Sequence, residues 1–248
     1  MIRLYISHAT PAFASGLTFA LLPEQGRYLT SVMRKVTGDE VLVFNGRDGE
    51  WRARIAEAGK KLVALELLEQ TQQQRAVQGP ILAVALIKRA PLEYIVEKAT
   101  ELGVARIQLL ITRRAQADHT KLERLNLIAQ EAAEQTERLD VPQILAPIRL
   151  NAFLKAPECE AILFGDEEST HDGDVRETEP LMRVLSTLSA KRTAILIGPE
   201  GGFDNEERES LRAMEIVFPV NLGPRILRAD TAAISALTLY QAVVGDWC

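Results

Sequence analysis

Short hydrophobic runs, partly alternating with polar residues, dominate the first 75 residues of the chain. The runs are Val41–Phe44, Trp51–Ile55 and Leu62–Leu67. Between them lie Asn45–Gly49 and Ala58–Lys61, whose Asn-Gly, Asp-Gly and Gly-Lys pairs are typical of β-hairpin turns. Several short strands joined by such turns predict a small β-barrel.

After Pro80 the pattern changes to apolar strands that alternate with amphipathic helices. Ile81–Ile87 is a continuous apolar run, typical of a strand that is buried on both faces. The pattern predicts further strands at Ile107–Ile111, Ala161–Phe164, Thr193–Ile197 and Ile216–Val220, and helices at about 91–103, 120–138, 181–188, 204–214 and 231–244. Strands alternating with helices predict an α/β domain with a mostly parallel sheet.

The polar, Gln-rich stretch Gln70–Gln78 separates the region of short strands from the region of alternating strands and helices, and it ends at Gly79-Pro80. Such a stretch is the best candidate for a linker in this chain. We therefore predict two domains, a barrel over residues 1–72 and an α/β domain over residues 73–248.

Charge and cysteine content narrow the class of protein. The net charge is −5, which argues against a protein that holds nucleic acid by bulk charge, yet the first 75 residues carry +2 and the remainder −7.

Cys159 and Cys248 are too few for a disulfide framework, so we expect a reducing, cytoplasmic location. No apolar run is long enough to span a membrane. Ala12–Leu22 resembles a signal peptide weakly, but Ser15 and Gly16 interrupt it and favour a strand or turn.

Two glycine-bearing segments, Ile197–Phe203 and Asn221–Thr231, each follow a predicted strand. Loops beyond the carboxyl ends of strands are where α/β sheets bind ligands, and glycines allow a ligand to approach the backbone. Neither segment matches a known phosphate-binding motif, and Glu200 would repel a phosphate. A ligand with cationic groups, or with a ribose and an adenine edge, suits the first segment better. A tight turn without a ligand explains that segment equally well. In the second segment, Arg225 and Arg228 flank Ile226 and Leu227 as if held against a pocket.

Other reactive side chains have simpler interpretations. His8, His119 and His171 are scattered and show no metal-ligand spacing, so we expect no metal site. Cys159 has no histidine pattern beside it and is expected to be a small buried residue. The polar positions of 131–138 recur at helical spacing, which is typical of a solvated helix face.

The two glycine-bearing segments also carry a family resemblance. Leu196–Phe203 and Leu222–Ala233 resemble the C-terminal motifs of the RsmE family, bacterial methyltransferases of the SPOUT superfamily that methylate N3 of a uridine in 16S ribosomal RNA. Further segments that resemble the family are Lys88–Gly103, Ile128–Arg138, Val32–Arg34, Gly38-Asp39 and Phe44–Gly46. Two positions depart from it, because Asp230 replaces the more usual Glu and Tyr28 the common His.

The resemblance implies a PUA-like barrel, an α/β domain with a deep trefoil knot, a homodimer and S-adenosylmethionine as the cofactor. The cofactor-binding positions that it implies are Leu163, Phe164, Gly165, Ile197, Gly198, Pro199, Glu200, Gly201, Leu222, Gly223, Ile226, Leu227, Arg228, Thr231 and Ala232. Any direct role of the shortened carboxylate of Asp230 is left open.

We therefore expect a metal-free methyltransferase that acts on 16S ribosomal RNA or the small ribosomal subunit. Arg228 is the expected catalytic residue, stabilising charge on the uracil oxygens. The expected RNA contacts are Arg3, Arg34, Lys88 and Arg113. The alternatives are a non-catalytic RNA-binding or ribosome-assembly protein, an RNA methyltransferase with a different target site, and an α/β enzyme that uses a nucleotide cofactor on small molecules.

Overall fold

The computed structural model describes residues 1–7, 10–75, 78–116, 121–166, 178–189 and 192–247. His8, His119, His171, Thr120, Cys248 and residues 167–177 lie outside these ranges. The chain forms two compact units, one of Met1–Ala76 with Ala133–Val141 and one of Val77–Ala132 with Pro142–Cys248. The single boundary expected after residue 72 therefore differs from the structure, which groups 133–141 with the N-terminal unit.

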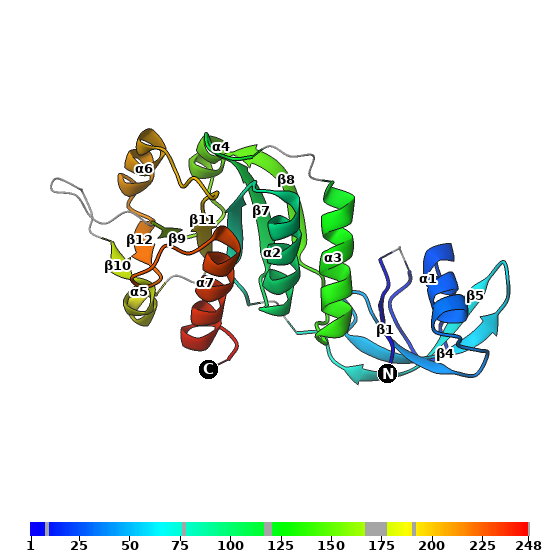
Figure 1. Ribbon diagram of the computed structural model, residues 1–248. Helices are drawn as coiled ribbons and strands as arrows, with labels where there is room; N and C mark the ends of the chain where they lie inside the picture. The colour runs from blue at the N-terminus through cyan, green and yellow to red at the C-terminus, as the bar shows by residue number, and fades with distance from the viewer. Residues whose placement is uncertain (8–9, 76–77, 117–120, 167–177, 190–191, 248) are drawn as a thin grey trace. The chain divides into compact units, whose positions relative to one another are not determined.

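The N-terminal unit is a five-stranded sheet with a short helical segment (Figure 1). Its elements are β1 (Arg3–Tyr5), β2 (Thr18–Ala20), α1 (Pro23–Arg27), the π-helical turn η1 (Tyr28–Val32), β3 (Glu40–Phe44), β4 (Glu50–Ala58) and β5 (Val63–Gln72). The strand order is β1-β3-β4-β5-β2, and β3–β4 and β4–β5 are antiparallel hairpins. The two predicted hairpins are thus confirmed. The sequence pattern missed β1, α1 and η1, which are short. Part of Ala12–Leu22 forms β2, in agreement with the strand or turn expected there.

The alternation seen in the sequence places one face of this sheet in a hydrophobic core. Val41, Val43, Ile55, Leu65 and Leu67 are all fully buried in it. Successive side chains of a strand point to opposite faces, which is why alternate residues of β3 and β5 share this core.

Arg3 of β1 is buried in the N-terminal unit, with only 8% of its surface exposed. Its Nε donates to Glu50 Oε2 at 2.6 Å, and the guanidinium lies 4.5 Å from the centre of the Phe44 ring. Its remaining nitrogens donate to the carbonyl oxygens of Ala133, Glu134 and Arg138. Arg3 therefore does not serve as the RNA contact expected from the sequence. It holds 133–141 to the N-terminal unit, which explains the difference in the unit boundary.

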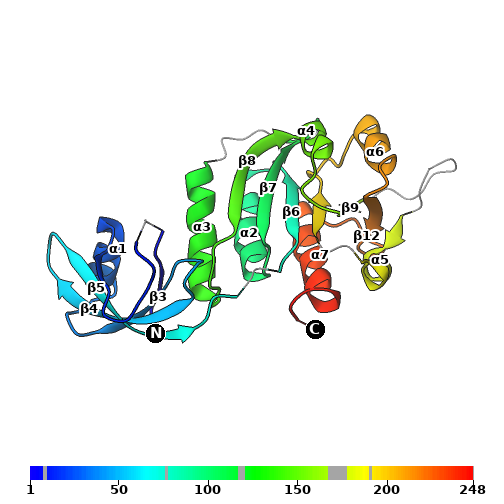
Figure 2. The ribbon, with the colours of Figure 1, turned by 180° about the vertical axis from the view of Figure 1, so that it is seen from behind.

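The C-terminal unit contains a seven-stranded parallel sheet, which confirms the predicted α/β class. Its strands are β6 (Ile81–Ala85), β7 (Arg106–Ile111), β8 (Gln143–Arg149), β9 (Ala161–Gly165), β10 (Glu179–Pro180), β11 (Thr193–Ile197) and β12 (Val217–Asn221). The order is β10-β12-β9-β11-β6-β7-β8, and β6, β7 and β8 lie side by side in Figure 2. The sequence pattern missed β8 and β10.

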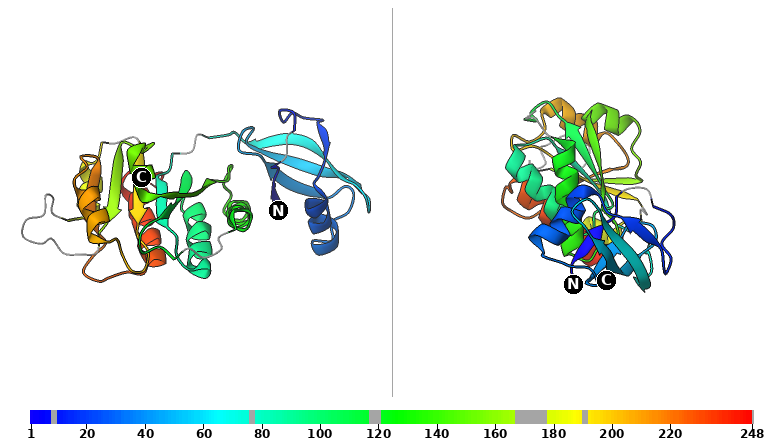
Figure 3. Two further views of the ribbon diagram at one scale, coloured as in Figure 1. Left: turned by 90° about the horizontal axis from the view of Figure 1, so that it is seen from above. Right: turned by 90° about the vertical axis from the view of Figure 1, so that its right-hand side faces the viewer.

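Helices cover both faces of this sheet (Figure 3). They are α2 (Arg89–Glu101), α4 (Leu150–Lys155), α5 (Leu181–Thr187), α6 (Asn205–Arg212) and α7 (Ala229–Val243). The helix α3 (Leu122–Gln135) begins in the C-terminal unit, and its last three residues belong to the N-terminal unit. α2 packs on α7, which also contacts α5 and β11, whereas α4 packs on β7 and β8 and α6 on β12. The predicted helix over 120–138 ends earlier, at Gln135, because Glu137 adopts a left-handed φ of 62°.

The strands β6, β9 and β11 of the C-terminal unit are buried on both faces, as their continuous apolar runs predict. Phe164 and Leu196 pack with Phe153 of α4 and Leu211 of α6 in one hydrophobic cluster. No helix among the described residues is both long and apolar enough to cross a membrane. The deep trefoil knot stays a prediction from the family resemblance.

The buried Arg3–Glu50 pair generates the first prediction. Arg3→Ala leaves the Glu50 carboxylate buried without its cation, so we expect the free energy of unfolding to fall by about 3–5 kcal/mol. Urea denaturation measures the change. In the matched control Arg52→Ala, which breaks an exposed ion pair with Glu69, we expect a loss below about 1 kcal/mol. Equal losses in the two variants would contradict a structural role for Arg3.

The same pair also makes stability depend on pH. Burial by itself would raise the pKa of Glu50, but hydrogen bonds from Thr71 and Arg3 outweigh it and leave the pKa below its ordinary value of 4.5. The stabilisation is therefore complete above that value and is lost as the pH falls through the lower folded-state pKa. As the pH is lowered through this acidic range, the free energy of unfolding of Arg3→Ala should fall by less than that of the wild type.

Candidate active-site pocket

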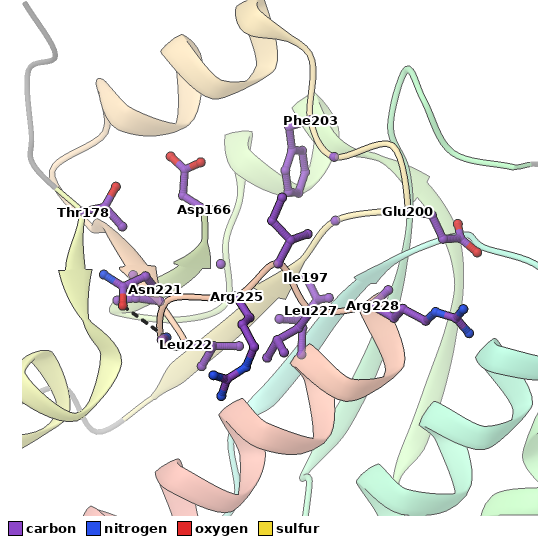
Figure 4. Close-up of a pocket in the computed structure, with 18 of the residues that line it drawn as sticks. Asp166, Thr178, Ile197, Glu200, Phe203, Asn221, Leu222, Arg225, Leu227 and Arg228 are labelled. Atoms are coloured by element: carbon purple, nitrogen blue, oxygen red, sulfur yellow. Dashed lines mark hydrogen bonds between the residues drawn. The ribbon is translucent and has the colours of Figure 1, made fainter. Parts of the chain in front are cut away.

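The carboxyl ends of three neighbouring strands surround a cavity of about 740 Å³ in the C-terminal unit (Figure 4). β9 lies between β11 and β12 in the sheet, and all three run parallel. The residues that directly follow these strands, Asp166, Gly198 and Leu222, therefore lie at one edge, where open α/β sheets bind their ligands.

The first glycine-bearing segment forms one wall of the cavity. Gly198 lies against the Phe203 ring, so closely that a Cβ at this position would be 2.7 Å from Phe203 Cε2. The ring itself packs edge-on against Phe164, with 5.1 Å between the ring centres. Gly202 has a φ of 66° and lines the cavity. Gly201 does not line it, and its carbonyl instead accepts a hydrogen bond from Arg114 Nη1 at 2.8 Å.

The second segment and the first turn of α7 form the opposite wall. Gly223 has a φ of 111°, and a Cβ there would have no neighbour within 4 Å. α7 begins at Ala229, two residues before the predicted start, so that Arg228 is its N-cap residue. The carbonyl of Arg228 accepts from Ala232 N at 2.8 Å. The small residues Ala229 and Ala232 thus face the cavity from a fixed helix end.

A buried ion network closes the inner side of the cavity. Asp166, next to the end of β9, has a side chain that is 1% exposed and accepts from Arg212 Nη2 at 2.7 Å. Arg208 Nε lies 3.2 Å from the other carboxylate oxygen of Asp166. Arg212 also donates to Thr178 Oγ1 at 3.2 Å. These contacts join the end of β9 to α6 and give the inner cavity a rigid, polar boundary.

The mouth of the cavity carries three exposed charges, Glu200, Arg225 and Arg228. Figure 4 shows Glu200 and Arg228 on one side, opposite Asp166 and Thr178. Over the residues that the structure describes, none of the three mouth charges forms an ion pair. The carboxylate of Asp230, two residues further on, accepts hydrogen bonds from Thr231 N at 2.7 Å and from Thr231 Oγ1 at 3.3 Å.

Most of the cofactor-binding positions expected from the sequence line this one cavity. They are Gly165, Ile197, Gly198, Pro199, Glu200, Leu222, Gly223, Ile226, Leu227, Arg228 and Ala232. Leu163 and Phe164 do not, because both are fully buried within the sheet. Gly201 and Thr231 lie outside the lining as well.

Further residues line the cavity besides these expected positions. Six of them belong to the two glycine-bearing segments that the sequence singled out, although the resemblance does not count them among the cofactor-binding positions: Gly202, Phe203, Asn221, Pro224, Arg225 and Ala229. Sequence reasoning missed Asp166, Thr178, Arg208 and Val220 as site residues. Asp166 could have been found, since it is a polar residue just after a predicted strand. Arg208 could not, because nothing in the helical pattern of 204–214 says which face meets the end of β9.

The remaining residues expected to contact RNA have different surroundings. Lys88 and Arg34 are exposed, and Arg34 has an unusual φ of 54°. Arg113 pairs with Asp204 at 2.8 Å and with Glu206, so its charge is neutralised at the start of α6. We therefore do not retain Arg113 as an RNA contact.

The structure also bears on the metal and thiol expectations. Cys159 is buried, and burial raises the pKa of its thiol, as expected for a packing residue. Among the described residues, no three acidic, histidine or cysteine side chains are grouped so that they could hold a metal ion.

A parallel α/β sheet with a glycine-walled cavity at its carboxyl edge defines the class of nucleotide- and cofactor-binding α/β proteins. Comparison with known families narrows this class. Residues 76–241 match the RNA methyltransferase domain, and residues 21–68 match the RNA methyltransferase PUA domain. The chain belongs to the RNA methyltransferase family that includes ribosomal RNA small subunit methyltransferase E, as the resemblance of its motifs had indicated.

Individual relatives match over nearly the full chain. Ribosomal RNA small subunit methyltransferase E of Rickettsia conorii is 36% identical, over 89% of this chain and 87% of the relative. A structure from Legionella pneumophila, solved with the cofactor S-adenosylmethionine, is 30% identical with a TM-score of 0.79 and 97% of both chains covered. Ribosomal RNA small subunit methyltransferase E of Neisseria gonorrhoeae, bound to S-adenosylmethionine, is 25% identical with a TM-score of 0.80 and 100% of both chains covered.

The contact between Gly198 and Phe203 generates the second prediction. Gly198→Ala forces the Phe203 ring, which is buried against Phe164, to move, and we expect a loss of about 1–3 kcal/mol in the free energy of unfolding. Gly201→Ala is the matched control, because its Cβ would meet Arg114 at an ordinary 3.6 Å. Urea denaturation compares the two variants. A Gly198→Ala protein as stable as Gly201→Ala would show that the ring moves without cost.

Proposed function

We propose that this protein transfers a methyl group from S-adenosylmethionine to N3 of a uridine in 16S ribosomal RNA. The observation that carries the proposal is the glycine-walled cavity at the carboxyl edge of the sheet, in a chain of this methyltransferase family. Relatives named for the small ribosomal subunit, and related structures bound to this cofactor, support it.

The residues of the cavity fit this cofactor. Its volume of about 740 Å³ lies within the range of small-molecule sites. Ile197, Leu222 and Leu227 offer apolar walls for an adenine, and Gly223 leaves open space where a side chain would intrude. The carboxylate of Glu200 suits the positive charges of a sulfonium and an ammonium group. When bound, the cofactor supplies an electrophilic methyl group.

Side chains of the protein must then prepare the acceptor nitrogen. N3 of uridine carries a proton at neutral pH, so the uracil anion that forms on its removal needs stabilisation. Arg228 stands at the cavity mouth with its guanidinium exposed, and a guanidinium can donate two parallel hydrogen bonds to uracil oxygens. N3 lies on the base-pairing edge, so the uridine must be unpaired or flipped out of its stack to reach the cavity.

The N-terminal unit is proposed to supply RNA affinity. Val32 is 66% exposed, and Tyr28, Met33 and Val36 beside it are exposed as well, which is unusual for so short a segment. Exposed arginines at 27 and 34 add positive charge to this surface, which we call the η1 patch (residues 27–36). Apolar and aromatic side chains among arginines are typical of surfaces that bind single-stranded RNA.

We also propose that the protein is a cytoplasmic homodimer that acts on 16S ribosomal RNA or the small ribosomal subunit. The exposed apolar side chains of Tyr94, Leu127 and Trp247 on the C-terminal unit provide surface that a second copy could bury. Sedimentation analysis of the purified protein tests the dimer.

Two measurements test the activity itself. Calorimetric titration should show saturable binding of S-adenosylmethionine that survives EDTA, and Gly223→Val should weaken it because valine is strained at a φ of 111°. Mass spectrometry of ribosomal RNA from a deletion strain should show loss of 3-methyluridine. Cofactor binding without that loss would favour a different target site, and absence of cofactor binding would favour a non-catalytic RNA-binding protein. Methylation of free nucleosides or other small molecules would favour small-molecule chemistry.

The exposed guanidinium of Arg228 generates the third prediction. Arg228→Lys keeps the charge but loses the planar fork, so we expect the methyl-transfer rate to fall about a hundredfold, as on loss of one preorganised donor. Single-turnover kinetics with saturating cofactor and RNA measures the rate. Cofactor affinity and folding should be unchanged, and a variant that keeps its rate would remove Arg228 from the mechanism.

The η1 patch generates the fourth prediction. Replacing Arg27 and Arg34 together by alanine should weaken RNA binding and reduce its salt dependence, by about 0.7 in log–log slope for each phosphate that is no longer neutralised. The matched control replaces Arg52 and Arg54, which already pair with Glu69 and Glu66. Filter binding at several salt concentrations measures the slope. Equal slopes for both double variants would place the RNA elsewhere.

A further inference from the structure

At the mouth of the cavity, one apolar side chain is almost entirely exposed to solvent. Ile226 lines the cavity, yet 78% of its surface is exposed. Leu227, the next residue, is only partly exposed and lies beside Ile197 in Figure 4. Leu227 can therefore cover a ligand inside the cavity, whereas Ile226 is placed to cover a group that arrives at the mouth.

The charges around Ile226 indicate what kind of group that is. Arg225 and Arg228 stand on either side of it in the chain, are exposed, and form no ion pair with any residue that the structure describes. The cofactor has one carboxylate for a guanidinium group to bind, and its sulfonium and ammonium groups repel both arginines. A nucleotide fits the pair of arginines better, because its phosphates are anionic and its base offers a flat surface to an apolar side chain.

The loop that carries Ile226 is anchored at both ends. At its start, Gly223 N donates to Asn221 Oδ1 at 3.3 Å, and at its end the Arg228 carbonyl accepts from Ala232 N at 2.8 Å. An exposed side chain on an anchored loop reaches its ligand without a large loss of backbone entropy.

We propose that Ile226 packs against the face of the target uracil at the cavity mouth and that Arg225 binds a phosphate next to that nucleotide. This inference rests on the proposed function and assigns Ile226 to the RNA rather than to the cofactor, where the sequence resemblance had placed it. Ile226 thereby positions the base whose oxygens Arg228 contacts.

Three variants of the full-length protein test this role. Ile226→Ala should lower the single-turnover methylation rate at subsaturating RNA about tenfold, on the scale of removing one base-packing side chain. Ile226→Val should keep most of the rate, because it retains a branched apolar surface. Met182→Ala is the matched control, since Met182 is also exposed (49%) but lies on α5 outside the cavity lining. The cofactor dissociation constant should stay within about twofold of the wild type in all three, because none of these side chains is assigned to the cofactor.

A double-mutant cycle isolates the contact with the base. The wild type should bind RNA with the target uridine about tenfold more tightly than the same RNA with an abasic site there. Ile226→Ala should bind the two RNAs almost equally. If Ile226→Ala weakens cofactor binding, the side chain belongs to the cofactor site, and if it dissociates a dimer, a second copy covers it. A wild-type rate for Ile226→Ala would also overturn the proposal. Failure of the proposed function would instead appear as a wild type that does not methylate RNA.

Discussion

Parallel pairing of β9, β11 and β12 is the constraint on which the rest of the site depends. Parallel strands end at the same edge, so loops that are far apart in the chain meet around one cavity. Glycines then decide what that edge can hold. Gly198 accommodates the Phe203 ring, whereas Gly223 leaves open space beside the cavity. One glycine thus serves packing, and the other fits a role in binding.

Charged side chains likewise fall into two groups, those that stabilise the fold and those that are available to bind a ligand. Arg3 and Arg212 are buried and have carboxylate partners within the protein. Arg113 is exposed but neutralised at the start of α6. Arg225 and Arg228 remain exposed at the cavity mouth. A chain with a net charge of −5 can thus present local positive surface where an RNA phosphate or uracil oxygen would arrive.

The two units contribute different physical capacities. The C-terminal unit offers an open-mouthed cavity with apolar walls and a rigid inner boundary, which suits a small cofactor. The N-terminal unit offers the η1 patch, an open apolar surface with two arginines, which suits an extended ligand. A methyltransferase that acts on one base of a large RNA needs both, because the cofactor must be shielded while most of the substrate stays outside.

The sequence by itself determined the α/β class, the hairpins of the N-terminal unit and most of the residues around the cavity. The spacing of hydrophobic residues indicates which positions are buried, and glycines directly after a strand indicate the carboxyl edge of the sheet. Both signals come from residues that are close together in the sequence. Tertiary structure alone decided the roles of Arg3, Arg113 and Asp166, because their hydrogen-bond partners lie 46 to 135 residues away in the sequence. It also separated Leu227 from Ile226, since adjacent residues of a loop have no periodicity that tells which one faces inward.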